Sequence, residues 1–181
     1  MRIPLAALCL TLLFPAQTAQ ASSSRPSASQ PSTSRPSPFQ SFVGRWAGNL
    51  EYQDYGADRR VKIPVQLTIT ASGTDSARWL FSYDDFGTTV SSDETHRWAT
   101  GTYTVKTAGQ PTTQTFRSTT FAALARPGGQ ATLLGSELEN GVKVEVRRTL
   151  RLGARTLVTL TETRQPGGDF RFRNQSSYTR K

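Results

Sequence analysis

"FVGRWAGNLEYQDY", residues 42 to 55, is the stretch that decides the fold. Apolar residues or glycines occupy every even position from 42 to 52, and a period of two is typical of a β-strand with one buried face. The same period recurs in residues 61–69, 79–83 and 142–146. No window after residue 43 has the periodicity of a helix, so the sequence predicts an all-β domain.

Glycine, asparagine and aspartate clusters separate these runs and indicate turns. The spacing predicts eight to ten strands, at about 43–54, 60–70, 77–84, 94–106 in one or two pieces, 114–125, 130–138, 142–152, 155–163 and 169–180. Sequential hairpins of this kind make one long antiparallel sheet. Such a sheet either splits into a sandwich or closes into a barrel.

The chain is predicted to have three parts. Residues 1–21 have a basic start, an apolar stretch too short to span a bilayer and a small-x-small cleavage site, which predicts a signal peptide and export to the periplasm or the outside of the cell. Residues 22–38 are rich in serine and proline and predict a disordered linker. Residues 39–181 form a single domain without cysteine, since Cys9 lies in the signal.

Two stretches resemble a known family. The Gly-x-Trp of residues 44–46 and the final strand "FRFRNQSSYTRK", residues 170–181, resemble the lipocalin-like members of the calycin superfamily and, more narrowly, a group of small exported bacterial proteins of unknown function. The resemblance implies an up-and-down barrel with Trp46 across one end and Arg180 or Arg173 over its ring. Gly44 suits that crowded end, and a guanidinium over an indole contributes about 0.5–2 kcal/mol.

The barrel interior has candidate ligand-binding residues. The interior is expected to hold Phe81 and Tyr83, together with Trp79, Phe116 and Phe121. Arg148 shares its parity with five aliphatic residues of the 142–152 run and should face the same core. Three alternatives follow for Arg148: an ion pair with Glu162, a bulge that turns it outward, or contact with an anionic ligand.

Catalytic and metal-binding signals are weak. His96 follows Asp93 and Glu94, which could orient a general base, but this arrangement is more typical of a surface histidine at a strand start. Asp84 and Asp85 are better explained by a turn than by a cation site. No catalytic residue, metal or cofactor is therefore expected, although calycin barrels include a few isomerases.

Charge suggests the class of partner. Without the signal the net charge is +8, one less than the +9 of the whole chain, and arginines concentrate in the last three predicted strands. Adjacent strands would gather them on an outer patch for an anionic envelope polymer or lipid headgroups, whereas nucleic acid is not expected. The alternative is a solvated exterior on which Glu145, Glu162 and Asp169 pair with these arginines.

Three functions from different classes remain open. The first is a monomeric barrel that binds a small apolar or amphipathic ligand. The second is a solidly packed barrel that acts as a structural or interaction module at the envelope, because a narrow barrel can be filled by its own side chains. The third is a calycin-type isomerase.

Overall fold

A computed structural model describes residues 37–181 of the chain. The predicted signal peptide and nearly all of the predicted linker lie outside these residues. Within them the chain forms ten strands and two short 3₁₀ helices: η1 (Pro38–Phe42), β1 (Gly44–Asp54), β2 (Arg59–Ala71), β3 (Ser76–Asp85), β4 (Thr88–Ala99), β5 (Thr102–Thr107), β6 (Thr113–Arg117), η2 (Phe121–Ala125), β7 (Gly129–Glu139), β8 (Val142–Leu152), β9 (Thr156–Arg164) and β10 (Arg171–Arg180). No helix in this part of the chain is both long and apolar enough to cross a membrane.

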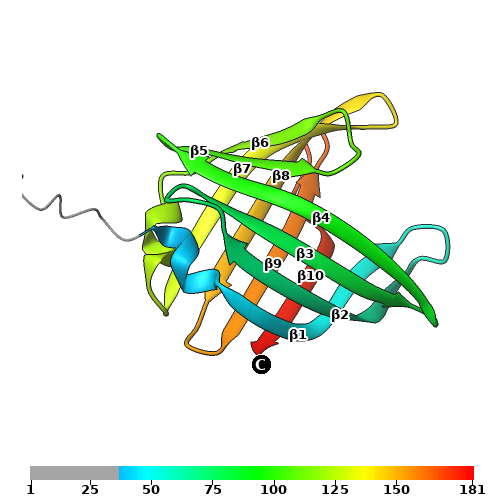
Figure 1. The fold of residues 1–181 in the computed structure, drawn as a ribbon. Helices are drawn as coiled ribbons and strands as arrows, with labels where there is room; N and C mark the ends of the chain where they lie inside the picture. The colour runs from blue at the N-terminus through cyan, green and yellow to red at the C-terminus, as the bar shows by residue number, and fades with distance from the viewer. Residues whose placement is uncertain (1–36) are drawn as a thin grey trace, which may run out of the picture. The chain divides into compact units, whose positions relative to one another are not determined.

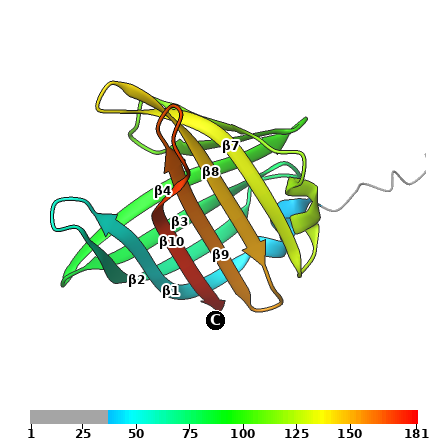
Figure 2. The same ribbon diagram turned by 180° about the vertical axis from the view of Figure 1, so that it is seen from behind.

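The strands form one closed antiparallel barrel (Figures 1 and 2). Each strand pairs with the strands before and after it in sequence, and β1 pairs with β10 from Trp46↔Arg180 to Tyr52↔Asn174. The predicted all-β up-and-down barrel is therefore confirmed, and the sandwich alternative is wrong. Closure removes the free sheet edges that a ten-stranded sandwich would expose.

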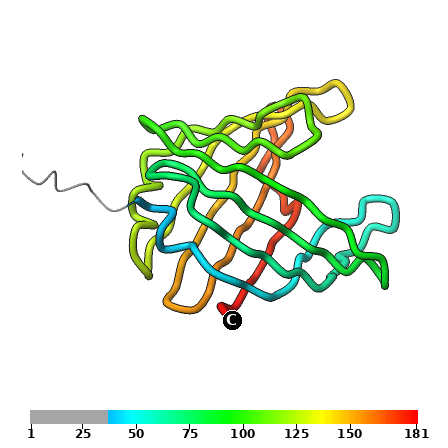
Figure 3. Tube along the Cα trace, viewed as in Figure 1, coloured from blue at the N-terminus to red at the C-terminus, as the bar shows by residue number. Residues whose placement is uncertain are grey.

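The two ends of the barrel differ. Both 3₁₀ helices lie at one end, which we call the helical end, and the turns between β1 and β2 and between β7 and β8 lie at the opposite, hairpin end (Figure 3). At the helical end Phe39 and Phe42 of η1 and Phe121 of η2 are fully buried, and the Phe39 and Phe121 rings lie 5.2 Å apart. These aromatic side chains fill that end.

Two predicted strands have different bounds. The segment predicted at 94–106 is two strands, β4 and β5, and β4 begins six residues earlier, at Thr88. Gly101 separates the strands with φ +79°, a value that favours glycine. The segment predicted at 114–125 is a strand only to Arg117. The chain then forms η2, which buries Phe121 and Leu124 at the helical end.

Trp46 lies at the helical end and is 1 % exposed. The Arg180 guanidinium lies over its indole, with Cζ 4.2 Å from the ring centroid, and donates to the carbonyls of Val43 at 2.6 Å and Ser41 at 2.7 Å. Gly44 has φ +138°, and a side chain there would press on Arg180. One residue thus covers the indole and ties η1 to β10.

Of the two arginines expected over Trp46, Arg180 takes that place and Arg173 lies elsewhere. It precedes Arg180 by seven residues on β10, which puts it at the hairpin end. There a bulge between Phe172 and Asn174 interrupts the pairing with β9, and Arg173 forms ion pairs with Glu137 and Glu139 of β7.

Candidate functional site

The middle of the barrel contains a chamber of about 210 Å³, which we call the inner chamber. Its walls come from β1, β3, β4, β5, β8, β9 and β10. The aromatic and aliphatic lining residues are Leu50, Trp79, Phe81, Tyr83, Tyr103, Leu150 and Tyr178, and the polar ones are Glu94, His96, Arg148, Thr159, Thr161, Asn174 and Ser176. The helical end is packed with side chains, but the middle of the barrel is not.

Arg148, Phe81 and Tyr83, predicted as ligand-binding residues, all line this chamber. Arg148 lies in an unbroken part of β8, paired with Leu133 of β7 and Thr161 of β9, so the bulge alternative is not formed. Because Arg148 alternates in step with Val146 and Leu150, its side chain faces the interior, as the sequence predicts.

The predicted ion pair between Arg148 and Glu162 is wrong. Leu152 pairs with Leu157 rather than with Thr156, which shifts the β8–β9 register by one residue. Glu162 therefore lies opposite Arg147, whose Nε donates to its carboxylate at 2.8 Å.

Arg148 has no carboxylate partner in the described part of the chain. Among residues 37–181 it forms neither an ion pair nor a side-chain hydrogen bond, and its Cζ lies 5.0 Å from the centroid of the Phe116 ring. A guanidinium stays charged at physiological pH and needs acceptors when it is removed from water. The chamber therefore contains a positive charge with unused donors.

Beside Arg148 lies a buried polar cluster of Glu94, His96 and Tyr103. His96 is 3 % exposed, so its expected place on the surface is wrong. β4 runs through residues 93–96 without a turn, and its even positions face inward. His96 Nε2 donates to Glu94 Oε2 at 2.9 Å, and Nδ1 accepts from the Tyr103 hydroxyl at 2.5 Å; the tautomer is assigned from these partners.

These contacts set the charge of the cluster. Burial lowers the pKa of His96, although Glu94 acts in the opposite direction, so the ring is neutral. Burial alone would raise the pKa of Glu94, but the hydrogen bond and charge of His96, together with the charge of Arg148, lower it. Burial raises the pKa of Tyr178 to about 12 and also raises those of Tyr83 and Tyr103, so their hydroxyls stay protonated. Glu94 is therefore the ionised acid of the chamber.

A second pocket, which is largely open to solvent and which we call the outer chamber, adjoins the first toward the hairpin end. It measures about 240 Å³ and is lined by Leu50, Tyr52, Ile63, Tyr83, Asp85 and Val90. Leu50 and Tyr83 line both chambers. The outer chamber is mostly apolar, whereas the inner chamber contains the charges.

Sequence reasoning considered Glu94 and His96 as a possible catalytic pair but expected His96 on the surface, and it missed Tyr103. The sequence signal for Glu94 and His96 was the alternation within "DETHRW", residues 93–98. Both residues share parity with Trp98, which packs against the core. The threonines and Ser176 that line β9 and β10 could not be found, because alternating threonine is equally typical of an outer face.

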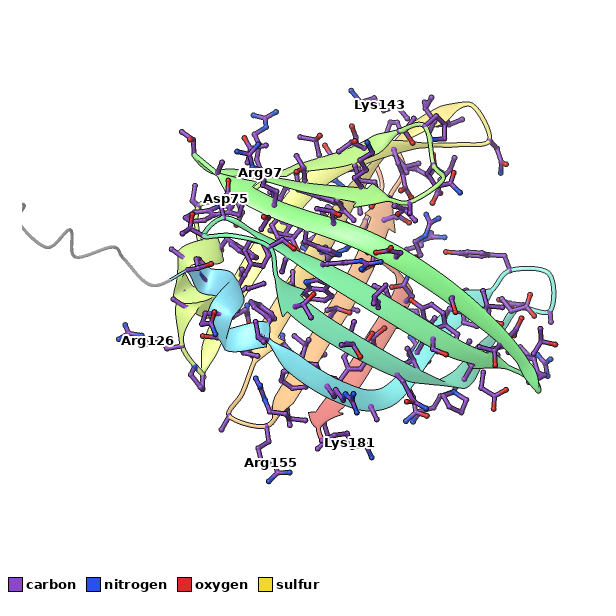
Figure 4. All side chains as sticks on the ribbon, in the orientation of Figure 1. Asp75, Arg97, Arg126, Lys143, Arg155 and Lys181 are labelled. Carbon is purple, nitrogen blue, oxygen red and sulfur yellow. The ribbon has the colours of Figure 1, made fainter. Side chains whose placement is uncertain are left out.

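The remaining predicted features lie outside the chambers. Asp84 accepts from the Gly87 amide at 2.7 Å, which closes the predicted turn. Of the arginines in the last three strands, Arg147 pairs with Glu162 and Arg164 with Glu145, which are two of the pairs expected on a solvated exterior. Arg155 and Lys181 project from the barrel surface in Figure 4.

Comparisons with known proteins agree on the fold. No family model matches the sequence, and no curated protein matches it. Rv2717c from M. tuberculosis has a solved structure with TM-score 0.55 and 14 % identity, covering 80 % of this chain and 97 % of its own. An S-type phycobiliprotein lyase, CPES from Guillardia theta, gives TM-score 0.54 and 11 % identity, covering 79 % and 90 %. Both likenesses are to the fold alone, a closed antiparallel barrel of lipocalin-like architecture.

Proposed function

We propose that this protein binds a small amphipathic anion inside its barrel, with the anionic group on Arg148. The observation that carries the proposal is that Arg148 faces an internal chamber with no acidic partner in residues 37–181. A ligand carboxylate or similar group would accept the donors that the barrel leaves unused.

Trp79 supports the same conclusion. Its ring lines the inner chamber, and its buried Nε1 has no acceptor within the described residues. A buried donor without a partner is rare in folded proteins and calls for an acceptor from a ligand or an ordered water. Trp98 Nε1 also lacks an acceptor within the described residues but does not line the chamber, so the proposal rests on Arg148 first and on Trp79 second.

The outer chamber suits the apolar part of the ligand. With the anionic group on Arg148, an apolar body would pass Leu50 and Tyr83 toward Ile63 and Val90. Burial of apolar surface there stabilises the complex by about 25 cal/mol per Å² before the cost of association.

The test uses octanoate and its neutral analogue octanamide as probes, measured by calorimetry on the purified protein. We expect octanoate to bind more tightly than octanamide. We also expect Arg148→Met to weaken the affinity for octanoate about ten- to a hundredfold, because a charge-assisted hydrogen bond contributes about 1.5–3 kcal/mol.

Arg147→Met is the matched control, since Arg147 is the next residue of β8 but pairs with Glu162. The control should bind both probes as the wild type does. Equal binding of octanoate by the wild type and Arg148→Met would overturn the proposal.

We also propose that the protein is exported, supported by the signal-like residues 1–21. N-terminal sequencing of protein recovered from its host should begin at Ser22, and a start at Met1 would contradict export by cleavage. Mass spectrometry of that protein under non-denaturing conditions should show a bound mass lost in Arg148→Met.

A further inference from the structure

The inner chamber contains a negative charge as well as a positive one. Glu94 lines the same chamber as Arg148, and its side chain is 21 % exposed, so the chamber can reach it. The two residues form no ion pair, so Glu94 does not occupy the donors of Arg148.

One Glu94 oxygen has hydrogen-bonding capacity to spare. Oε2 accepts from His96, whereas Oε1 accepts only a long bond from the Ser92 hydroxyl at 3.4 Å. An ionised carboxylate can accept several hydrogen bonds.

His96 holds this carboxylate in place. Its two ring nitrogens are engaged by Glu94 and Tyr103, and its ring stacks on Trp79 with centroids 4.3 Å apart. His96 therefore cannot turn toward a ligand, and Glu94 cannot leave the chamber without breaking a buried contact.

We infer that Glu94 determines which anions the inner chamber accepts: a singly charged anion that also carries a hydroxyl or N–H group, and not a dianion. The inference rests on the proposed function, because Arg148 must hold the first negative charge. A second negative charge would lie near Glu94 in a partly buried site, where like charges repel more strongly than in bulk water. A hydroxyl at the same place would instead donate to Oε1.

Four probes test this selection: 4-hydroxybenzoate, benzoate, the dianion terephthalate and the neutral 4-hydroxybenzamide. A cavity of about 150 Å³ holds benzene, so these rings suit the inner chamber. In the wild type at neutral pH we expect 4-hydroxybenzoate to bind more tightly than benzoate, and benzoate at least about tenfold more tightly than terephthalate.

Glu94→Gln should remove the discrimination. Glutamine retains an oxygen to accept from His96, and the ratio of terephthalate to 4-hydroxybenzoate affinity should rise about tenfold or more. Glu94→Met provides a second variant in case the amide disturbs the cluster. Glu162→Gln, on the outer wall beside Arg147, should leave the ratio unchanged.

The outcomes separate the inference from the proposed function. If the wild type binds terephthalate as tightly as benzoate, or neither Glu94 variant changes the ratio, the selection by Glu94 is overturned while binding lost in Arg148→Met still supports the anion site. If no carboxylate binds more tightly than 4-hydroxybenzamide, or none of the four binds, the anion site and the selection both fail.

Discussion

At the scale of single residues, Trp46 and Arg180 together stabilise the helical end. Trp46→Ala removes a fully buried side chain and, with it, the ring face that the Arg180 guanidinium covers. We expect a loss of about 3–5 kcal/mol in the free energy of unfolding, measured by urea denaturation. Arg126→Met, an exposed change at the same end (Figure 4), should stay within about 0.5 kcal/mol. An unchanged midpoint in Trp46→Ala would contradict the structural role of the indole.

His96 should make stability depend on pH. Burial lowers its pKa in the folded protein below the ordinary 6.5, so between these two values the unfolded chain binds more protons. Stability should therefore fall as pH drops below about 6.5, by at most about 1.4 kcal/mol per pH unit. The pKa of Glu94 is lowered from 4.5, so its contribution is lost only at more acidic pH.

His96 is the only histidine of the chain, which makes this test specific. Urea denaturation between pH 7 and pH 5 should show the slope in the wild type and a much smaller slope in His96→Gln. The same slope in both proteins would mean that His96 is not held neutral.

Arg148 shows what residue patterns can and cannot predict. A period of two fixes which face of β8 a residue occupies, because a strand without a bulge alternates strictly. Its partner depends on the β8–β9 register, and a shift of one residue moved Glu162 from Arg148 to Arg147. Register follows loop geometry, which "GAR" at residues 153–155 does not specify.

At the scale of elements, alternation was clearest where apolar residues dominate one face. β1, β2 and β8 were placed within about a residue of their bounds for this reason. β4 was placed six residues late because its inner face carries Val90, Ser92, Glu94 and His96, a mixture that resembles a turn followed by a strand. A polar interior hides the pattern that predicts strands.

Gly48 is an element-scale test of barrel closure. A Cβ there would overlap the Ser177 carbonyl, which belongs to β10 and cannot rotate away. Gly48→Ala should force β1 and β10 apart and cost about 3 kcal/mol or more in unfolding free energy. Gly168→Ala is the matched control, because its nearest contact, Gln165, lies 3.5 Å away. Equal stability of the two variants would contradict the close approach of β1 and β10.

At the scale of the whole barrel, the closed sheet was predictable but the chamber was not. The sheet closes because consecutive strands pair antiparallel and the last strand, β10, pairs with the first, β1. Whether a barrel is filled depends on how the large side chains are distributed along it. Here η1 and η2 bring Phe39, Phe42 and Phe121 to one end, whereas smaller polar side chains, Thr159, Thr161, Asn174 and Ser176, form part of the chamber wall in the middle. The sequence does not show that Phe121 belongs to a helix rather than to a strand.

The hairpin end should be the more mobile part of the barrel, and Arg173 limits that motion. Its Nη1 donates to Glu137 at 2.6 Å and also pairs with Glu139, so it joins β10 to β7 across β8 and β9. Because these side chains are about one third exposed, Arg173→Ala should change unfolding free energy by less than about 1 kcal/mol. Hydrogen exchange at Glu137 and Glu139 should nevertheless accelerate several-fold, while amides beside Trp46 stay protected. Octanoate should also associate faster with Arg173→Ala than with the wild type.

Arg164→Ala is the control, since Arg164 pairs with Glu145 on the adjacent strand and does not bridge more distant strands. If both variants exchange alike, Arg173 does not hold the end of the barrel together.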